Sequence, residues 1–369
     1  MKRVLLLFVL FGLFAACGSD DNSPQPTDDF DRKAMLSHWA DNVIVPGLEA
    51  NVADITTLVT AAEAFRDNPA DNEFQTLKTA WLEAYKEWQR IGIFEIGKAE
   101  ELQLISRMNL YPTDASGIEE NIAVGDYNLD LPSEKTRQGF PALDYLLYGI
   151  AADEAAVLAK FQDAAVGSAY RDYVVGVAQK MQSMLQTVLE DWNNGYRETF
   201  VDNDGNNATA STDRLVNDYI FYYEKHLRAG KVGIPAGVFS GAELPGNVEG
   251  LYSRQYSRDL LAISLDATED FFLGRSYDGS VSGPSLNTYL EELGTTKGGT
   301  ALADVIVDQW AVALAEIQSL NPNLYEQVNT GNTAMLRTYD ALQINVVNLK
   351  VDMLQALNIN VDYVDADGD

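Results

Sequence analysis

The chain contains few side chains that could carry nucleophilic or transition-metal chemistry. Its 369 residues include two histidines, His38 and His226, and one cysteine, Cys17. Disulfide scaffolds, cysteine-rich zinc sites and multi-histidine metal centres are excluded by these counts. Both histidines lie in stretches with the pattern of amphipathic helices, and no Gly-x-Ser-x-Gly turn occurs. A Ser-His-Asp or Cys-His nucleophilic site is therefore not expected, and carboxylates are the remaining candidates for cation chemistry.

One acidic loop has the spacing of a calcium site. Asp202, Asp204 and Asn206 supply oxygens at loop positions 1, 3 and 5, and Asp213 falls at position 12, as in an EF-hand. The loop has Asn207 where an EF-hand has glycine, and Asp213 is shorter than the usual bidentate glutamate. These four residues are calcium candidates, and an irregular polar linker is the alternative explanation.

Glu95 is a further carboxylate candidate. It stands between Phe94 and Ile96, just before Gly97, where a helix is expected to end. An acid flanked by apolar residues can point inward, where it needs a partner. A solvated helix end is the alternative.

Apolar residues beyond Phe30 recur at helical spacing. The clearest stripes are Phe74, Leu77, Trp81, Tyr85 and Trp88; Val174, Val177, Met181, Leu185, Val188 and Trp192; and Met335, Tyr339, Leu342, Val346, Leu349 and Met353. One-sided stripes of this kind are typical of helices that bury one face, and alternation of period two is scarce. The sequence therefore predicts an all-α fold of bundled helices.

Polar, turn-rich residues divide the chain near its middle. The segment 202–212 reads DNDGNNATAST, which predicts an N-terminal helical bundle over 31–200 and a C-terminal helical bundle over 201–369. The hexapeptides 144–149 and 269–274 share the order acid, any residue, two apolar residues, any residue, glycine. They are consistent with an internal duplication, and two unrelated helix ends are the alternative.

The beginning of the chain has the pattern of an export signal. Lys2 and Arg3 precede an apolar run, Val4 to Ala16, which is shorter than the roughly 20 residues that a permanent membrane span needs. The small residues before Cys17 resemble a bacterial lipobox. We expect a signal peptide over 1–16, lipidation at Cys17, and a flexible lipid-anchored linker over 17–30, where polar residues, prolines and acids dominate. An ordinary signal peptide with an unrelated cysteine is the alternative.

The charge balance restricts the partners. The chain has 55 Asp and Glu against 26 Lys and Arg, a formal net charge of −29. A phosphate backbone would be repelled, so nucleic acid is not an expected partner. The expected partner is a membrane, reached through the lipid on Cys17. This places the protein at the bacterial cell envelope, as an outer-membrane lipoprotein that is periplasmic or surface-exposed.

Several stretches resemble the imelysin family, also called the M75 peptidase family, in order and spacing across nearly the whole mature chain. The matching segments are 39–51, 80–97, 109–122, 139–149, 215–239, 248–257 and 352–369. The resemblance implies a secreted or lipid-anchored bacterial protein of two α-helical bundles with a cleft at or near their interface. Family members are implicated in iron uptake, and the family was first described as metallopeptidases.

The metal motif of that family is altered here. Members proposed to bind metal carry Gly-x-His-x-x-Glu, whose His and Glu lie on one helix face and can converge on a cation. The aligned segment begins at Gly139, with Pro141 in place of the histidine and Asp144 in place of the glutamate. Proline has no donor atom and aspartate is one methylene shorter, so the His-Glu metal pair is not available. Initiation of a helix is an alternative explanation for both residues.

The resemblance also implies a ligand-binding cleft to which both halves contribute. The candidates for this cleft are Glu95, Pro141, Asp144, Glu249, Tyr252, Ser253 and Arg254. Glu95 and Asp144 are in addition candidates for holding a cation, with hydrogen bonding as the other role for Asp144. Arg254 or Arg258 could pair with a cleft carboxylate or an anionic ligand, and a surface salt bridge is the alternative.

These observations predict a non-catalytic, imelysin-like envelope lipoprotein that acts in the uptake of iron or another ligand through the cleft. An outer-membrane uptake system is a candidate partner. The cofactor is left unassigned, with iron or another cation as the candidate, and no catalytic residue is assigned. Two alternatives stay open: an M75-type metallopeptidase with a metal held by carboxylates, and a structural or adaptor lipoprotein.

Overall fold

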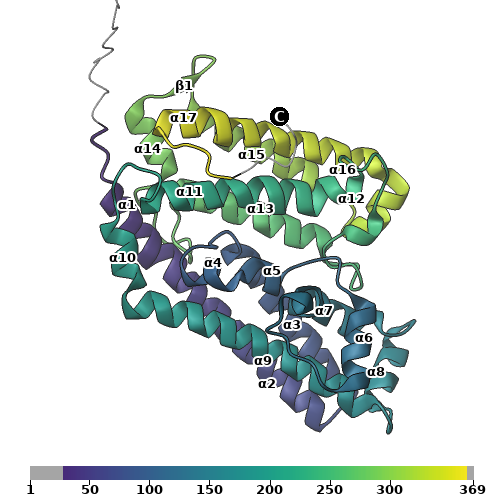
Figure 1. Ribbon diagram of the computed structural model, residues 1–369. Coiled ribbons are helices and arrows are strands. Elements are labelled where there is room, and N and C mark those ends of the chain that lie inside the picture. Colours follow the sequence, from purple (N-terminus) through teal and green to yellow (C-terminus); the bar gives the residue numbers. More distant parts are fainter. Residues whose placement is uncertain (1–27, 364–369) are drawn as a thin grey trace, which may run out of the picture. The chain divides into compact units, whose positions relative to one another are not determined.

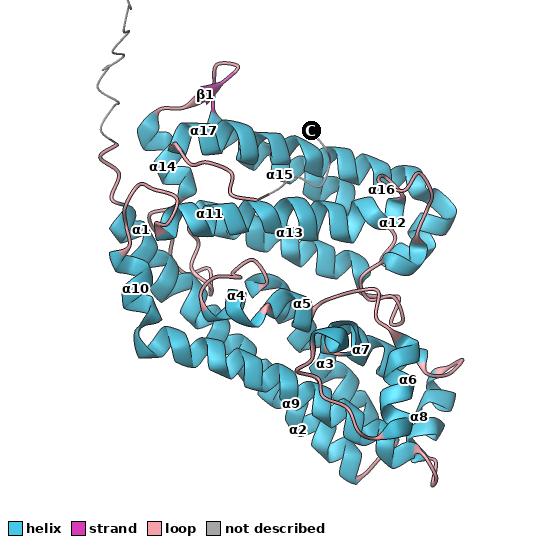
Figure 2. Cartoon of the chain, in the orientation of Figure 1, coloured by secondary structure: helices cyan, strands magenta, loops and turns pink. Residues whose placement is uncertain are grey.

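The computed structural model describes residues 28–363, and the chain from Asp31 onward is one compact unit. Helices dominate this unit (Figure 2), so the all-α prediction is confirmed. The strands within the described range are the two short ones of a hairpin, β1 (Thr296–Lys297) and β2 (Thr300–Ala301). The predicted signal peptide and Cys17 lie outside the described residues. The predicted division of the remainder at residue 200 stays a prediction.

Three long helices form the core of the first half. They are α2 (Val45–Asp67), α3 (Asp71–Ile91) and α9 (Gly167–Asp191), with α2 packed against both others (Figure 1). The stripes predicted for α3 and α9 are buried, as expected for helices that pack on one face. At one end of this core, the ring centroid of Phe65 lies 5.3 Å from Phe74 and 5.1 Å from Phe161.

Shorter helical segments complete the first half. They are α1 (Arg32–His38), η1 (Trp39–Ile44), α4 (Lys98–Leu102), α5 (Leu104–Met108), α6 (Ala115–Val124), η2 (Pro132–Arg137), α7 (Gly139–Asp144), η3 (Tyr145–Gly149), α8 (Glu154–Gln162), η4 (Trp192–Tyr196) and α10 (Arg197–Asp202).

The helical run Arg32–Asp67, made of α1, η1 and α2, is long and apolar enough to cross a membrane by length and composition. Its apolar face is already occupied within the protein, because Leu48, Ile55 and Leu58 are buried, and α2 packs against α3 and α9. We therefore interpret this run as a core element of the first half.

The second half is a further group of packed helices, centred on α13 (Ser257–Leu273), α15 (Leu302–Gln318) and α16 (Leu324–Val347) (Figure 1). Trp310 is fully buried in it, with its ring centroid 5.1 Å from that of Phe272. The other segments are α11 (Ser211–Phe221), η5 (Tyr222–Gly233), α12 (Ile234–Ala236), η6 (Pro245–Asn247), α14 (Leu286–Leu293), η7 (Asn348–Met353) and α17 (Leu354–Leu357).

Helix α3 of the first half packs directly against α13 of the second. The long π-helical segment η5 also packs on α13. π-helical turns are uncommon, and they are frequent at functional sites because the wider turn redirects side chains. These contacts bring polar residues from α3, η5 and α13 together.

Candidate functional site

A buried polar cluster lies where these elements meet. We define it by five residues: Gln89 of α3, Asn109 after α5, Lys231 of η5, Glu249 in the loop before α13, and Ser264 of α13. The Glu249 carboxylate accepts hydrogen bonds from Gln89 Nε2 at 3.0 Å and Asn109 Nδ2 at 2.6 Å. Gln89 Oε1 in turn accepts from Lys231 Nζ and Ser264 Oγ, both at 2.8 Å. Each of the five residues is therefore hydrogen-bonded to at least one other member of the cluster.

Glu249 and Lys231 form an ion pair inside this cluster, with both side chains only 2% exposed. Burial lowers the pKa of Lys231, and the Glu249 carboxylate opposes that shift. A charge in the interior is tolerated only when it is paired and hydrogen-bonded. The ammonium of Lys231 therefore acts as the cation for Glu249, supplied by the chain itself.

Asp144 is held beside this cluster by backbone amides. Its side chain is buried, with Oδ2 accepting from the Tyr252 amide at 2.8 Å and Oδ1 from the Ser253 amide at 2.9 Å. Burial raises the pKa of Asp144 to about 6, while these hydrogen bonds act in the opposite direction. The carboxylate thus joins α7 to the loop before α13.

The backbone of that loop explains how two amides reach one carboxylate. Gly250 and Arg254 both have positive φ, 66° and 59°, and the Arg254 amide donates to the Gly250 carbonyl at 3.0 Å. The tight turn between them presents successive N–H groups to one side, an arrangement that favours an anion. In this protein the anion is Asp144.

Gly139 and Pro141 set the start of α7. Gly139 has a φ of 79°, and a Cβ there would overlap the carbonyl oxygens of Arg107 and Met108. Pro141 is buried in the first turn of the helix, where its missing N–H costs little. Glycine is therefore required for close packing, and Pro141 serves the start of the helix.

The other predicted cleft residues differ in their surroundings. Tyr252 is half-buried, with its ring centroid 5.0 Å from that of Tyr145. Ser253 is buried. Arg254 is exposed, and its guanidinium lies 4.5 Å from the ring centre of Tyr325. Arg258 pairs with Asp259. The cation at Glu249 is thus Lys231 rather than either arginine.

Glu95 lies in a separate pocket of about 320 Å³, which Asp144 does not line. Its Oε1 accepts a hydrogen bond from the Ile105 amide at 3.1 Å. Burial raises the pKa of Glu95 to about 7, and burial likewise raises the pKa of Asp218, in the same pocket, to about 7. The structure therefore brings Asp144 and Glu249 together and sets Glu95 apart from them.

The residues at the altered motif do not fit a catalytic metal ion. Between residues 28 and 363, no three His, Cys, Asp or Glu side chains converge as metal ligands. The side chain of Pro141 has no atom that could bind a metal. The Asp144 carboxylate accepts hydrogen bonds from two backbone amides, and the Glu249 carboxylate is paired with the Lys231 ammonium. A catalytic metal needs several protein donors and one open position.

The four calcium candidates also differ in the parts of the protein that they contact. Asp202 pairs with Lys33 on the surface, whereas Asp213 is buried at the start of α11. Asp204 and Asn206 lie in the loop between α10 and α11. Asn203 Nδ2 donates to the Thr209 carbonyl at 2.7 Å, so the loop is closed by its own side chains.

The two histidines occupy helical positions with different surroundings. His38 is buried, with Nε2 2.7 Å from the Gly274 carbonyl oxygen, which is a structural role. His226 lies beside Phe221 and Tyr222, at ring-centroid distances of 5.6 and 5.7 Å. Burial lowers the pKa of His226 to about 4, so this imidazole is neutral at pH 7.

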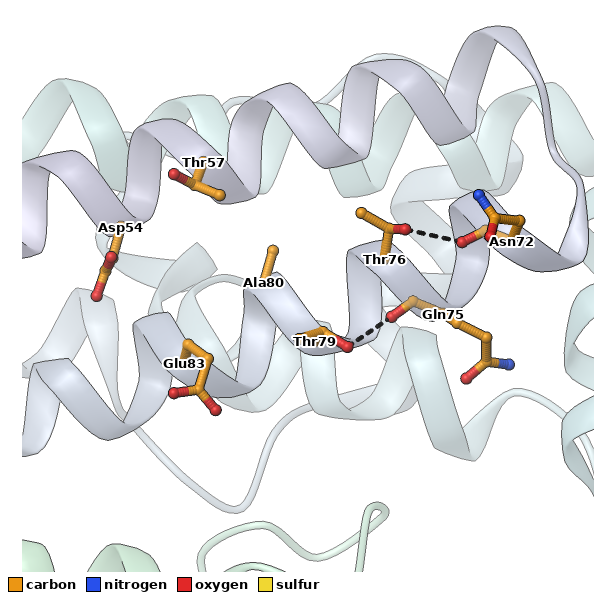
Figure 3. Close-up of a pocket in the computed structure, with 8 residues that line it drawn as sticks. All are labelled: Asp54, Thr57, Asn72, Gln75, Thr76, Thr79, Ala80 and Glu83. Atoms are coloured by element: carbon orange, nitrogen blue, oxygen red, sulfur yellow. Dashed lines mark hydrogen bonds between the residues drawn. The ribbon is translucent and has the colours of Figure 1, made fainter.

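A further groove of about 400 Å³ lies between α2 and α3 (Figure 3). Three threonines and Ala80 make up half of its lining, Asp54 and Glu83 lie at one end, and Asn72 and Gln75 lie at the other. Burial, followed by the nearby Glu83, raises the pKa of Asp54. None of the residues predicted for the cleft lines this groove.

Burial of these carboxyl groups predicts an unusual dependence of stability on pH. Asp144, Glu95 and Asp218 all have pKa values raised by burial, to about 6, 7 and 7. Between about pH 4 and these values the folded protein keeps protons that the unfolded chain has lost, so stability falls as pH rises. His226, whose pKa is lowered to about 4, opposes this trend below about pH 6.5, but the three carboxyl groups outweigh one imidazole. We expect the free energy of unfolding to be about 1–3 kcal/mol lower at pH 7.5 than at pH 5.

Urea unfolding at the two pH values measures this difference. Asp218→Asn should reduce it, because asparagine does not titrate. The same pH difference in a folded Asp218→Asn variant as in the wild-type protein would contradict the raised pKa of this carboxyl group.

The fold is all-α, and its packed helices enclose a buried polar cluster. The family model for imelysin, Peptidase_M75, matches residues 44–348, and the chain belongs to this family. A comparison with curated proteins finds no match.

Two solved structures are similar in fold. An imelysin-like protein from Psychrobacter arcticum 273-4 has 16% identity and a TM-score of 0.69, covering 90% of this chain and 97% of its own. A protein from Parabacteroides distasonis ATCC 8503, assigned as an iron-regulated protein A precursor, has 18% identity and a TM-score of 0.69, covering 90% and 96%. The predicted family resemblance is thus confirmed.

Sequence reasoning did not find Gln89, Asn109, Lys231 or Ser264. Lys231 had one local signal in the sequence, because it is the one charged residue in the segment 229–239. Its partner Glu249 is distant in sequence, and only the packing of η5 against the neighbouring loop shows the pair.

Proposed function

We propose that this protein is a non-catalytic, imelysin-like cell-envelope lipoprotein that takes part in the acquisition of iron or another ligand. The observation that carries the non-catalytic part is the bonding of Asp144 and Glu249. Two backbone amides hold the first carboxylate, and the Lys231 ammonium holds the second. Neither group is free to polarise a peptide bond or to activate water, which general base or metal catalysis requires.

A structural relative supports the acquisition role, and the sequence of the leader supports anchoring at the cell envelope. A structural relative is assigned as an iron-regulated protein A precursor. The lipobox-like residues before Cys17 support anchoring to a bacterial membrane, and an outer-membrane uptake system is the proposed partner. The anionic body, with a formal net charge of −29, favours cationic ligands or partners.

Expression and growth under iron limitation test the acquisition role. We expect the protein to be induced when iron is withheld and a deletion strain to grow more slowly on limiting iron. Unchanged expression together with unchanged growth would favour the structural or adaptor alternative. Purified protein incubated with Zn²⁺ or Fe²⁺ should cleave no peptide in a mixed substrate pool, and cleavage abolished by Asp144→Asn would favour the metallopeptidase alternative.

Anchoring is tested separately in the producing cells. Cys17→Ser should abolish incorporation of an alkyne-labelled fatty acid into the protein, because the proposed lipid is attached to this residue. Labelling of Cys17→Ser at the wild-type level would contradict lipid attachment at Cys17.

A further inference from the structure

The pocket that contains Glu95 combines carboxylates with aromatic rings. It lies between the segment that follows α3 and the helical run of α11 and η5, with the end of the described chain at its edge. Four carboxylates line it: Glu95, Glu100, Asp218 and Asp362. Three rings line it as well: Phe221, Tyr222 and Tyr363. We call this the carboxylate-aromatic pocket.

The negative charge of this pocket exceeds the positive charge that the protein supplies to it. Glu100 pairs with Arg214. Glu95 receives one backbone hydrogen bond from Ile105. Within the described residues, the half-buried Asp218 carboxylate makes no hydrogen bond or ion pair. A partly desolvated carboxylate gains most from a cation that also donates hydrogen bonds.

The arrangement of these groups distinguishes between kinds of cation. A single metal ion requires ligand oxygens within about 2–2.6 Å of one point, and among residues 28–363 no three carboxylates converge in that way. A larger cation can contact carboxylates on different walls. Aromatic faces attract ammonium and guanidinium groups. The Lys350 ammonium already lies 5.2 Å from the centre of the Tyr363 ring, so Phe221 and Tyr222 are the rings that we assign to the ligand. Phe221 and Tyr363 lie edge to face, with centroids 5.2 Å apart.

The volume sets the size of the ligand. About 320 Å³ is at the lower end of the range for small-molecule sites. Ile93 and Ile105 add apolar wall next to the carboxylates. We propose that the carboxylate-aromatic pocket binds a small organic cation, with one or two primary ammonium or guanidinium groups on a short carbon chain. This inference concerns a pocket that Asp144 does not line, and it does not depend on the proposed function.

Titration of the pocket provides a second signature. Burial raises the pKa of Glu95 and of Asp218 to about 7. The charged groups that face them are Glu100, Asp362, Arg214 and Lys135. A bound cation favours the ionised carboxylates, so the protein should release protons on binding near pH 7, and affinity should rise between pH 6 and pH 8.

Isothermal titration calorimetry of the full chain tests the ligand class. The probes are cadaverine and agmatine, with 1,5-pentanediol as the neutral counterpart of cadaverine. We expect saturable one-site binding of at least one amine, stronger at pH 8 than at pH 6, and no binding of the diol. Absence of binding by both amines at millimolar concentration, or equal binding of the diol, would overturn the inference. Binding of Mg²⁺ in place of the amines would also overturn it.

Variants locate the binding. Asp218→Asn should weaken amine binding about tenfold or more, because a charge-assisted hydrogen bond becomes a neutral one. Glu190→Gln, which removes one exposed carboxylate of α9 outside the pocket, is the matched control and should leave affinity unchanged. Thermal melts verify folding, and Glu95→Gln replaces Asp218→Asn if that variant is unfolded. Unchanged affinity in the folded pocket variant would refute the site.

Discussion

Replacing Lys231 with methionine is expected to destabilise the protein by about 3–5 kcal/mol, because Glu249 would be left buried without a cation. Both side chains are only 2% exposed. The loss should appear as a lower urea midpoint with an unchanged slope. Methionine keeps the length and apolar character of the lysine stem, so the variant removes mainly the charge.

Two comparisons isolate the ion pair. The double variant Lys231→Met with Glu249→Gln should recover much of the loss, because removing both charges of a buried pair is often close to neutral. Lys33→Met breaks a pair with Asp202 whose side chains are 54% and 69% exposed, and it should cost far less, because water screens an exposed ion pair. If Lys231→Met costs no more than Lys33→Met, Lys231 does not act as the cation of the cluster.

Gly139→Ala is the second substitution with a large expected effect. A residue with a side chain is strained at a φ of 79°, and its Cβ would overlap backbone oxygens of Arg107 and Met108, which have little freedom to move. We expect a loss of about 2–4 kcal/mol in the free energy of unfolding. The α7 start would shift, and the Asp144 carboxylate would shift with it.

Gly125→Ala is the matched control for the strain. Gly125 ends α6 with a φ of 72°, and open space surrounds the position of a Cβ there. This substitution should cost only the conformational strain, about 1–2 kcal/mol. The excess cost of Gly139→Ala therefore measures the close approach of α7 to the Arg107–Met108 backbone. Equal costs in urea unfolding would show that the overlap is relieved without penalty.

The sequence predicted the elements of this fold better than the interior of its site. Stripes such as Trp81, Tyr85 and Trp88 repeat at helical spacing, and that repeat is set by local geometry, so burial of one face follows from the sequence. The loss of the His-Glu metal pair could also be predicted from the sequence, because the absence of a metal-binding atom in Pro141 is a property of the residue itself.

The hydrogen-bond and ion-pair partners that come from distant segments could not be predicted from the sequence. Glu249 and Asp144 were both identified as candidates, but their partners depend on tertiary packing. The amides of Tyr252 and Ser253 carry no side-chain signal, and Lys231 reaches Glu249 only because η5 packs beside the loop before α13. A polar cluster assembled from five segments has no local pattern in the sequence.

The most direct test of the account is the metal content of the protein. Backbone amides hold Asp144 and the Lys231 ammonium holds Glu249, so neither carboxylate should bind a catalytic metal. Purified protein would be incubated with equimolar Zn²⁺ or Fe²⁺, dialysed, and measured by inductively coupled plasma mass spectrometry, beside Asp144→Asn. We predict far less than one equivalent of either metal in both proteins. One equivalent in the wild-type protein that is lost in a folded Asp144→Asn variant would contradict the account.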